Sequence, residues 1–235
     1  LVVEDDSGKV HRIMSRIVIG ADGLRSSVAH LVDAPVYRAG RHATATMYGY
    51  WSGVDVSGYE WYFVPGAAAG AIPTSGGDTC VFVSVPASEF SRRFVPHAGR
   101  GFRALLEMTA PQVAAQIPHI GESHLRGFPG HPGFFRRAHG SGWALVGDAG
   151  YFKDPLTAHG ITDALRDAEL LAAAVGEGSD EALANYQQKR DAASLDLFET
   201  TDAIASFAWD LDSVRVLHES LAKAMSREVK LLANV

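Results

Sequence analysis

Two segments of the chain place aspartate beside glycine directly after a short apolar run, and they constrain the fold more than any other feature. The first run, Arg16–Ile19, ends at Gly20-Ala21-Asp22-Gly23, and the second, Trp143–Val146, ends at Gly147-Asp148. A strand, then a loop, then a helix is the order that builds ligand sites. Either segment alone is typical of a helix cap or a turn, so the pattern is specific only because it occurs twice.

The stretch between these segments has the pattern of an antiparallel sheet. From Ala43 to Pro86, short aromatic and β-branched runs alternate with glycine and proline breaks, as in strands joined by turns. Helices are expected over 88–94 and 101–116, although Pro111 interrupts the second. A further helix is expected over 161–175, with an inward face made of Ile161, Ala164, Leu165, Ala168, Leu171 and Val175.

The two ends of the chain predict a hairpin and a helical region. Leu1–Glu4 and Val10–Ile19 flank Asp5–Lys9, which is a turn signal between two apolar runs. In the last third, residues spaced alternately three and four apart form a nearly continuous seam from Leu183 to Phe207. A second helix is expected after the break at 210–212.

Composition and missing motifs exclude several functional classes. The 235 residues carry 21 Lys+Arg and 27 Asp+Glu, a formal net charge of −6, so nucleic acid and anionic membranes are not expected partners. No apolar run reaches the ~20 residues of a membrane span. The single cysteine, Cys80, excludes a disulfide framework and any cysteine-based metal site. The chain contains no H-E-x-x-H, G-x-S-x-G or P-loop motif, and we expect a soluble cytoplasmic protein without a metal.

In this order, the two aspartate–glycine segments resemble the DG and GD motifs of the FAD-dependent monooxygenases of the aromatic hydroxylase type, whose relatives include geranylgeranyl reductases and flavin-dependent halogenases. The resemblance implies an α/β fold, which is α+β within this chain: segments of an FAD/NAD(P)-binding domain flank an antiparallel substrate-binding sheet, and helices follow. The expected parts are 1–36 with the DG motif, 37–137 with the sheet, 138–178 with the GD motif, and 179–235 with the C-terminal helices.

The resemblance also assigns cofactor-binding residues. Asp148, beside Gly147, matches the GD aspartate that accepts a hydrogen bond from the ribityl chain of FAD, and Asp22 and Gly23 match the DG pair near the pyrophosphate. The loop that starts at Pro155 matches the family segment beside the flavin ring, where the positive end of the next helix stabilises reduced flavin. The residues expected to contact the cofactor there are Pro155, Thr157, Ala158, His159, Gly160 and Ile161.

The chain departs from the family pattern at several positions. Ala158-His159-Gly160 stands where Gly-Gln-Gly is usual, Gly150-Tyr151 stands where Ala-His is familiar, and Ala29 replaces an arginine at the end of the DG motif. The G-x-G-x-x-G fingerprint that binds the ADP half of FAD is absent. We expect that fingerprint in an N-terminal segment of the same protein, upstream of Leu1.

An aromatic run, Tyr59–Val64, is the candidate substrate surface. Period-two alternation puts Tyr59, Trp61 and Phe63 on one face of a strand and Tyr62 on the other. The run is similar to the Y-x-W-x-F-P signature of geranylgeranyl reductases, and in the resembled family this sheet floors the substrate cavity. We predict that these four aromatic residues contact substrate, with an ordinary core strand as the alternative.

The resemblance implies an FAD-dependent oxidoreductase, and a monooxygenase is the favoured form. Such an enzyme uses NAD(P)H and O2 to hydroxylate or epoxidise an apolar or aromatic small molecule. No protein residue is assigned as catalytic, because the cofactor carries the chemistry. The alternatives are a flavin-dependent reductase of an isoprenoid-like double bond, a halogenase, and a non-catalytic truncated module.

Overall fold

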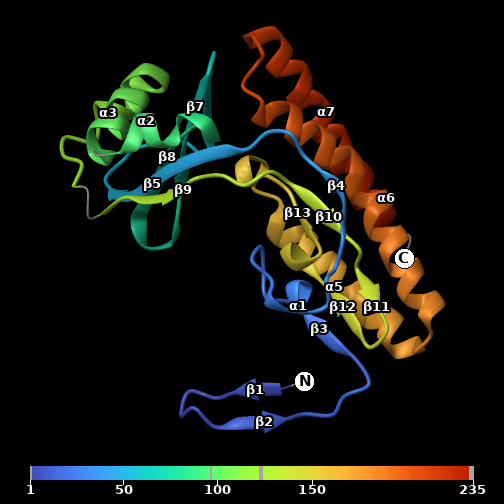
Figure 1. Cartoon of the computed structure of the whole chain (residues 1–235). Coiled ribbons are helices and arrows are strands. Elements are labelled where there is room, and N and C mark those ends of the chain that lie inside the picture. Colours follow the sequence, from blue (N-terminus) through green and yellow to red (C-terminus); the bar gives the residue numbers. More distant parts are fainter. Residues whose placement is uncertain (1, 96, 122–123, 233–235) are drawn as a thin grey trace.

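The computed structural model describes residues 2–95, 97–121 and 124–232 and places them in two lobes beside a pair of long helices (Figure 1). One lobe holds a five-stranded antiparallel sheet in the order β6-β7-β8-β5-β9. The other lobe holds two three-stranded sheets, in the orders β13-β10-β4 and β11-β12-β3, together with helix α5 (Gly160–Glu177). The paired long helices are α6 (Asp180–Ala205) and α7 (Leu211–Leu232).

The remaining strands and α-helices, apart from the N-terminal hairpin described below, are shorter than α5, α6 and α7. The strands are β3 (Val18–Gly20), β4 (Val36–Ala39), β5 (Thr44–Ser52), β6 (Glu60–Val64), β7 (Ala67–Pro73), β8 (Asp78–Pro86), β9 (Arg126–Phe128), β10 (Phe134–Arg136), β11 (His139–Gly140), β12 (Trp143–Leu145) and β13 (Tyr151–Phe152). The helices are α1 (Ser27–Leu31), α2 (Phe90–Phe94), α3 (Ala98–Thr109) and α4 (Pro111–Ala114). This mixed α/β architecture, with antiparallel strands between the two aspartate segments and helices at the end, confirms the predicted fold class.

The two faces of the five-stranded sheet have different roles. Ala45 and Met47 of β5 and Val83 of β8 are buried in one core, where α3 packs against them with Phe102 and Leu106. Side chains alternate between the faces of a strand, so the residues between these core positions point the opposite way. That second face is free of α3 and forms one wall of a cavity.

Strands β3 and β12 bring the two aspartate segments together. They pair in parallel, with Ala144 opposite Ile19 and Leu145 opposite Gly20. The carboxyl ends of parallel neighbours lie at the same edge of a sheet, so the loops that begin at Asp22 and Gly147 start beside each other. Segments far apart in the sequence therefore form one candidate site.

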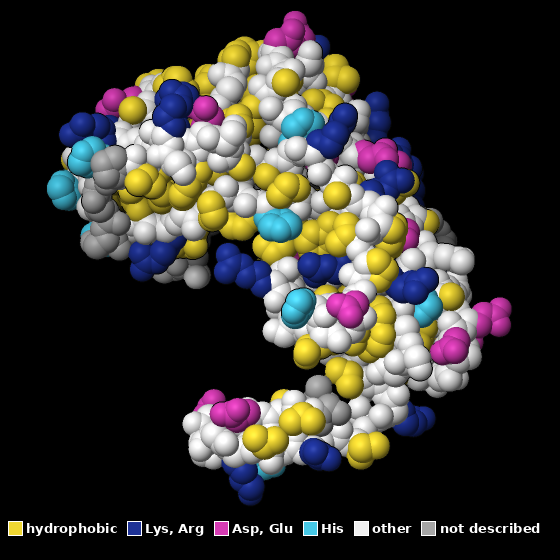
Figure 2. Space-filling view, viewed as in Figure 1, with side chains coloured by type: hydrophobic (Ala, Val, Ile, Leu, Met, Phe, Trp, Pro, Cys, Tyr) yellow, Lys and Arg dark blue, Asp and Glu magenta, His cyan; other side chains and the backbone are white. Residues whose placement is uncertain are grey.

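The N-terminal hairpin is confirmed, with a correction to its second strand. β1 (Val2–Glu4) pairs antiparallel with β2 (Val10–Arg12). The run Val10–Ile19 is not one strand, because it divides into β2 and β3, and β3 joins a different sheet. Figure 1 shows the hairpin projecting from the rest of the chain, and the space-filling view in Figure 2 shows a hollow between it and the sheet lobe.

The helix predicted over 101–116 is two helices. Pro111 ends the first pattern, because it starts α4 at the N-terminal position where its missing N–H is not needed. The helix predicted over 88–94 is shorter, since residues 87–89 form a 3-10 turn before α2 begins at Phe90.

The predicted inward face of α5 is largely wrong. Ile161 and Leu165 are 81% and 69% exposed, whereas Asp163, Arg166 and Asp167 are buried. Leu171, further along the helix, is buried as predicted. Charged groups occupy the inward positions of the first turns because they pair with one another across the fold, as described below. No helix in the described part of the chain is both long and apolar enough to cross a membrane.

Candidate functional site

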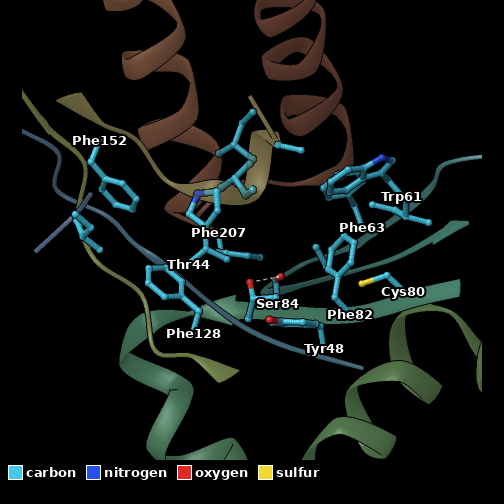
Figure 3. Close-up of a pocket in the computed structure, with 18 of the residues that line it drawn as sticks. Thr44, Tyr48, Trp61, Phe63, Cys80, Phe82, Ser84, Phe128, Phe152 and Phe207 are labelled. Carbon is cyan, nitrogen blue, oxygen red and sulfur yellow. Dashed lines mark hydrogen bonds between the residues drawn. The ribbon is translucent and has the colours of Figure 1, made fainter. Parts of the chain in front are cut away.

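A cavity of about 510 Å3 lies between the open face of the five-stranded sheet and the loop that follows β13 (Figure 3). The sheet contributes the aromatic residues Tyr48, Trp61, Phe63, Phe82 and Phe128. The opposite wall contains Phe152, Pro155, Leu156, Phe207 and Trp209. Asp148 is the one charged side chain among the described lining residues, so the cavity suits an apolar molecule.

Asp148 lies at the end of the cavity near the paired strands β3 and β12. The preceding Gly147 has φ 59°, a left-handed conformation that favours glycine, and a Cβ there would lie 3.3 Å from the Ala164 side chain. Burial raises the pKa of the Asp148 carboxyl, an effect that the nearby Lys153 ammonium partly offsets. Among the described residues, none donates a hydrogen bond to this carboxylate, which leaves it available to a ligand.

The loop from Pro155 to Ala158 is fastened to the sheet by Asp154. The Asp154 carboxylate accepts hydrogen bonds from the backbone N–H groups of Thr44 and Leu156, and burial raises its pKa to about 6. Ala158 has φ 51°, the left-handed region that costs an alanine about 1–2 kcal/mol. Thr157 Oγ1 is buried without a hydrogen-bonding partner in the described part of the chain. The loop thus holds a strained backbone and an unpartnered hydroxyl beside the cavity.

Helix α5 begins directly after this loop with an uncapped N-terminus. His159 occupies the N-cap position but makes no side-chain hydrogen bond to the helix, and the space around the Gly160 Cα is open. The first N–H groups of a helix carry partial positive charge and lack partners within it. They therefore favour an anionic or carbonyl oxygen at this position.

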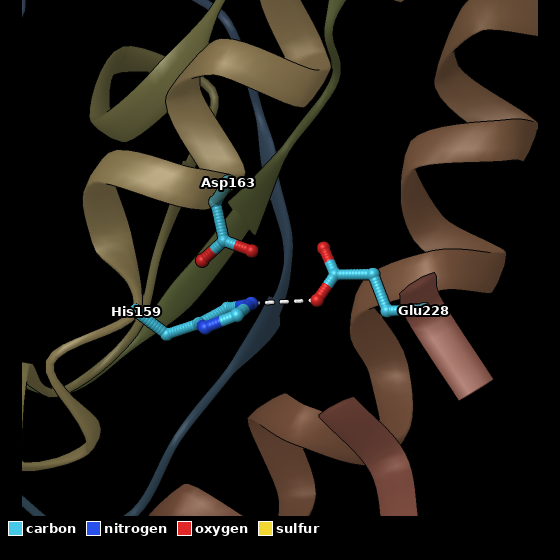
Figure 4. A group of neighbouring side chains, drawn as sticks. All are labelled: His159, Asp163 and Glu228. Carbon is cyan, nitrogen blue, oxygen red and sulfur yellow. Dashed lines mark hydrogen bonds and ion pairs between the residues drawn. The ribbon is translucent and has the colours of Figure 1, made fainter. Parts of the chain in front are cut away.

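His159 instead contacts the C-terminal helix (Figure 4). Its Nε2 lies 2.6 Å from a carboxylate oxygen of Glu228 on α7, and Asp163 lies beside both residues. Three ligand atoms this close could hold a metal ion, but both carboxylates already pair with Arg166, and Asp163 also pairs with Lys153. We therefore assign the group to a buried ion-pair network that links the loop to α5 and α7.

Sequence analysis missed this network. Arg166 also pairs with Asp167 at 2.7 Å and donates to the Ser194 hydroxyl on α6 at 2.8 Å. The signal in the sequence is the group of charged residues at 163, 166 and 167, which fall at inward spacing on the helix. Charges at such positions indicate partners elsewhere in the fold, and Glu228 is the partner that lies furthest away in the sequence.

Asp22 has a local structural role within the described residues. Its carboxylate accepts hydrogen bonds from the Ser26 hydroxyl at 2.5 Å and the Val28 N–H at 3.1 Å. Burial acts to raise the pKa of Asp22, but these hydrogen bonds outweigh it and the pKa is lowered. Gly23 follows with φ 77°, and the next residue, Leu24, reaches the cavity lining. The DG segment therefore turns the chain at the edge of the cavity, and its predicted contact with a cofactor stays a prediction.

The four predicted substrate residues do not all lie in the cavity. Trp61 and Phe63 line the cavity, as predicted for that face. Tyr62 points to the other face, where it packs against the core under α3 and donates a hydrogen bond to Glu60. Tyr59 precedes β6 and is 75% exposed. The structure thus corrects the prediction for Tyr59 and Tyr62, which do not belong to the cavity lining.

Six aromatic residues of the cavity lining were not predicted as site residues, namely Tyr48, Phe82, Phe128, Phe152, Phe207 and Trp209. Phe207 and Trp209 lie in the connection between α6 and α7 and pack on Phe63 and Ala68 of the sheet. The ring centroids of Trp209 and Phe63 are 6.1 Å apart. Phe207 had been assigned to the inward seam of a helix, and only the tertiary fold brings it over the sheet.

Comparisons with known proteins find relatives that share this fold. A digeranylgeranylglycerophospholipid reductase from Methanococcoides burtonii is 29% identical over 191 residues, which cover 75% of this chain and 42% of the relative. Pseudomonas aeruginosa PqsL, solved in complex with 2-aminobenzoylacetate, superposes with a TM-score of 0.68 at 23% identity, over 96% of this chain and 62% of PqsL. Klebsiella pneumoniae HpxO, solved with FAD and uric acid, gives a TM-score of 0.66 at 18% identity, over 98% of this chain and 63% of HpxO.

The chain thus spans less than two thirds of the length of each of these relatives. The family model that matches is described as an FAD binding domain, and the match covers residues 2–201 of the 235. Because this match takes in both aspartate segments and the sheet between them, the chain belongs to the FAD binding domain family.

Proposed function

We propose that this protein is an FAD-dependent monooxygenase that uses NAD(P)H and O2 to oxygenate an apolar or aromatic small molecule. The observation that carries the proposal is the apolar cavity of about 510 Å3 that ends on Asp148 and the loop Pro155–Ala158. Membership of the FAD binding domain family and the FAD complex of HpxO support the choice of cofactor. Bound FAD would supply the transfer of electrons from NAD(P)H to O2.

The groups at this end of the cavity have the chemistry that FAD requires. A free carboxylate such as Asp148 accepts a hydrogen bond from a sugar-like hydroxyl and would repel a phosphate, so the ribityl chain is its suitable partner. The Thr157 hydroxyl is buried and unpartnered within the described residues. The N–H groups at the start of α5 suit the carbonyl edge of the flavin ring. We propose that Gly23 and Gly147 shape the same site through their left-handed backbone, and that Asp22 does so through the turn that its carboxylate holds.

The remaining lining determines which molecules enter. Aromatic and aliphatic side chains remove water from the reacting centre and offer stacking surface to a ring or a chain. No lysine or arginine occurs among the described lining residues, so a carboxylated substrate would find no charge partner there. The proposed substrate is therefore neutral and largely apolar.

Asp148→Ala should weaken FAD binding by about 1.5–3 kcal/mol, the range for loss of a charged hydrogen-bond partner. The fold should survive, because no described residue donates a hydrogen bond to this carboxylate. The measurement is a titration of FAD into the apoprotein, followed by quenching of flavin fluorescence. Asp55→Ala, which removes an exposed carboxylate from the sheet lobe, is the matched control and should bind FAD as the wild type does. Equal affinity for Asp148→Ala and the control would reject the cofactor assignment.

Trp61→Ala and Tyr62→Ala should affect different properties, although the two residues are adjacent. Trp61 faces the cavity, so its loss should raise the KM for substrate or uncouple NAD(P)H oxidation from oxygenation, with FAD affinity nearly unchanged. Tyr62 faces the core under α3, so its loss should lower stability and leave coupling intact. Oxygen uptake compared with NAD(P)H consumption measures coupling, and thermal denaturation measures stability. Uncoupling in Tyr62→Ala alone would show that the assignment of the two faces is reversed.

A reductase of an isoprenoid-like double bond is the second candidate. It is supported by the 29% identity to a protein named as a digeranylgeranylglycerophospholipid reductase and by the tryptophan that lines the cavity. Substrate-dependent oxygen uptake separates the two candidates, because an oxygenase consumes one O2 for each product and a reductase consumes none.

A further inference from the structure

The sheet wall of the cavity carries one pair of hydroxyl groups among its aromatic side chains. Thr46 on β5 and Ser84 on β8 lie directly opposite each other on neighbouring strands, and their hydroxyl oxygens are 2.9 Å apart. Both residues line the cavity. Figure 3 shows this hydrogen bond in the middle of the wall, with Phe128 on one side and Phe82 on the other. A hydrogen-bonded pair is thus set into a mainly aromatic wall, which also includes Thr44 and Tyr48.

The pair has hydrogen-bonding capacity that the protein does not use. Two hydroxyls together offer two O–H donors, and the bond between Thr46 and Ser84 uses one of them. Within the described residues, neither hydroxyl makes another hydrogen bond to a side chain or to the backbone, so one O–H remains free. When an apolar ligand displaces water from the cavity, a donor left without a partner costs free energy.

The hydroxyl pair lies near the cofactor loop. The backbone N–H of Thr44 donates to Asp154, the residue that begins this loop. Thr46 is two residues further along the same strand, which corresponds to roughly 7 Å. The free hydroxyl therefore lies close to the end of the cavity where the flavin is proposed to bind.

We propose that Thr46 and Ser84 determine specificity by donating one hydrogen bond to the ligand. The ligand class is a neutral, predominantly apolar molecule that carries one oxygen acceptor, a hydroxyl or a carbonyl, near its reacting end. This inference rests on the proposed function, which supplies the cofactor and the cavity as the substrate site. It adds a polar requirement that the aromatic lining alone does not impose.

The test compares two probes of similar shape, 2-naphthol and 2-methylnaphthalene, by equilibrium dialysis against the FAD-loaded protein. The ratio of their dissociation constants reports the contribution of the hydroxyl. In the double variant Thr46→Val, Ser84→Ala, the preference for 2-naphthol over 2-methylnaphthalene should fall about two- to tenfold, the range for one neutral hydrogen bond. Binding of 2-methylnaphthalene should be unchanged or tighter.

Ser52→Ala is the matched control. Ser52 is on the same strand as Thr46 and its hydroxyl also bonds across to β8, at Asp78, but this pair is exposed and outside the cavity lining. The control should keep the wild-type ratio. If the double variant fails to fold, as judged by circular dichroism, Thr46→Val combined with Ser84→Cys serves, because valine keeps the shape of threonine and the cysteine S–H is only a weak donor.

The outcomes distinguish this inference from the proposed function. An unchanged ratio in a folded variant would overturn the specificity role while both probes still bind, and the proposed function would stand. Failure of both probes to bind the wild type would contradict the cavity as the substrate site and would remove the basis of both proposals. A reduced ratio in the variant with FAD affinity retained would support the role of the pair.

Discussion

Replacing Arg166 with alanine should lower the free energy of unfolding by about 3–5 kcal/mol, the cost of leaving buried charges without their partner. The Arg166 side chain is 1% exposed and pairs with Asp163, Asp167 and Glu228. Its guanidinium also donates to the Ser194 hydroxyl. The substitution removes the cation that three buried carboxylates share. It also removes the side chain through which α5 contacts both α6 and α7.

Urea denaturation followed by circular dichroism measures this loss. The matched control is Arg227→Ala on α7, because Arg227 pairs with Asp196 while both side chains are more than half exposed. Such surface pairs contribute about 0–1 kcal/mol. A loss below about 1 kcal/mol for Arg166→Ala, equal to that of the control, would mean that the network does not stabilise the fold.

Phe102→Ala should also lower stability by about 3–5 kcal/mol, the range for truncating a buried phenylalanine. Phe102 is fully buried between α3 and the sheet, and its ring centroid lies 5.4 Å from that of Trp51. Removing the ring leaves a void that the neighbouring side chains fill only in part. Because the same sheet forms the cavity wall on its other face, affinity for apolar probes should fall as the sheet loosens.

Thermal or urea unfolding measures the effect, with Met108→Ala on the same helix as the control. Met108 is 49% exposed, so its truncation should change stability by less than about 1 kcal/mol. Equal losses for the two variants would contradict the packing of α3 on the sheet.

The elements predicted with success depend on local patterns. The strands of the central sheet follow from alternation in runs such as Tyr59–Val64, and the start of α5 follows from the loop at Pro155–Gly160. The pairing of β3 with β12 is non-local and was not predicted, although the resemblance did predict that both aspartate segments belong to the cofactor domain. The strands and the helix start were predictable because residues close together in the sequence determine them.

The features that were not predicted depend on contacts between distant residues. Periodicity assigned Ile161 and Leu165 to the inside of α5, because apolar residues are usually buried. The fold buries Asp163 and Arg166 instead, since Glu228 and Ser194 arrive from other helices to pair with them. The positions of Phe207 and Ser84 in one cavity likewise follow from tertiary packing that no local pattern contains.

The connection between α6 and α7 forms a part of the cavity wall that is distinct from the sheet and from the cofactor loop. Phe207 and Trp209 belong neither to the sheet nor to the loop at Pro155, although both pack on Phe63 and Ala68 of the sheet. Phe207 has φ 52°, a backbone conformation that glycine adopts more easily than any other residue. Phe207→Gly would enlarge the cavity, and the relief of backbone strain would offset part of the cost of removing a buried ring, so adaptation to bulkier ligands can begin at this position.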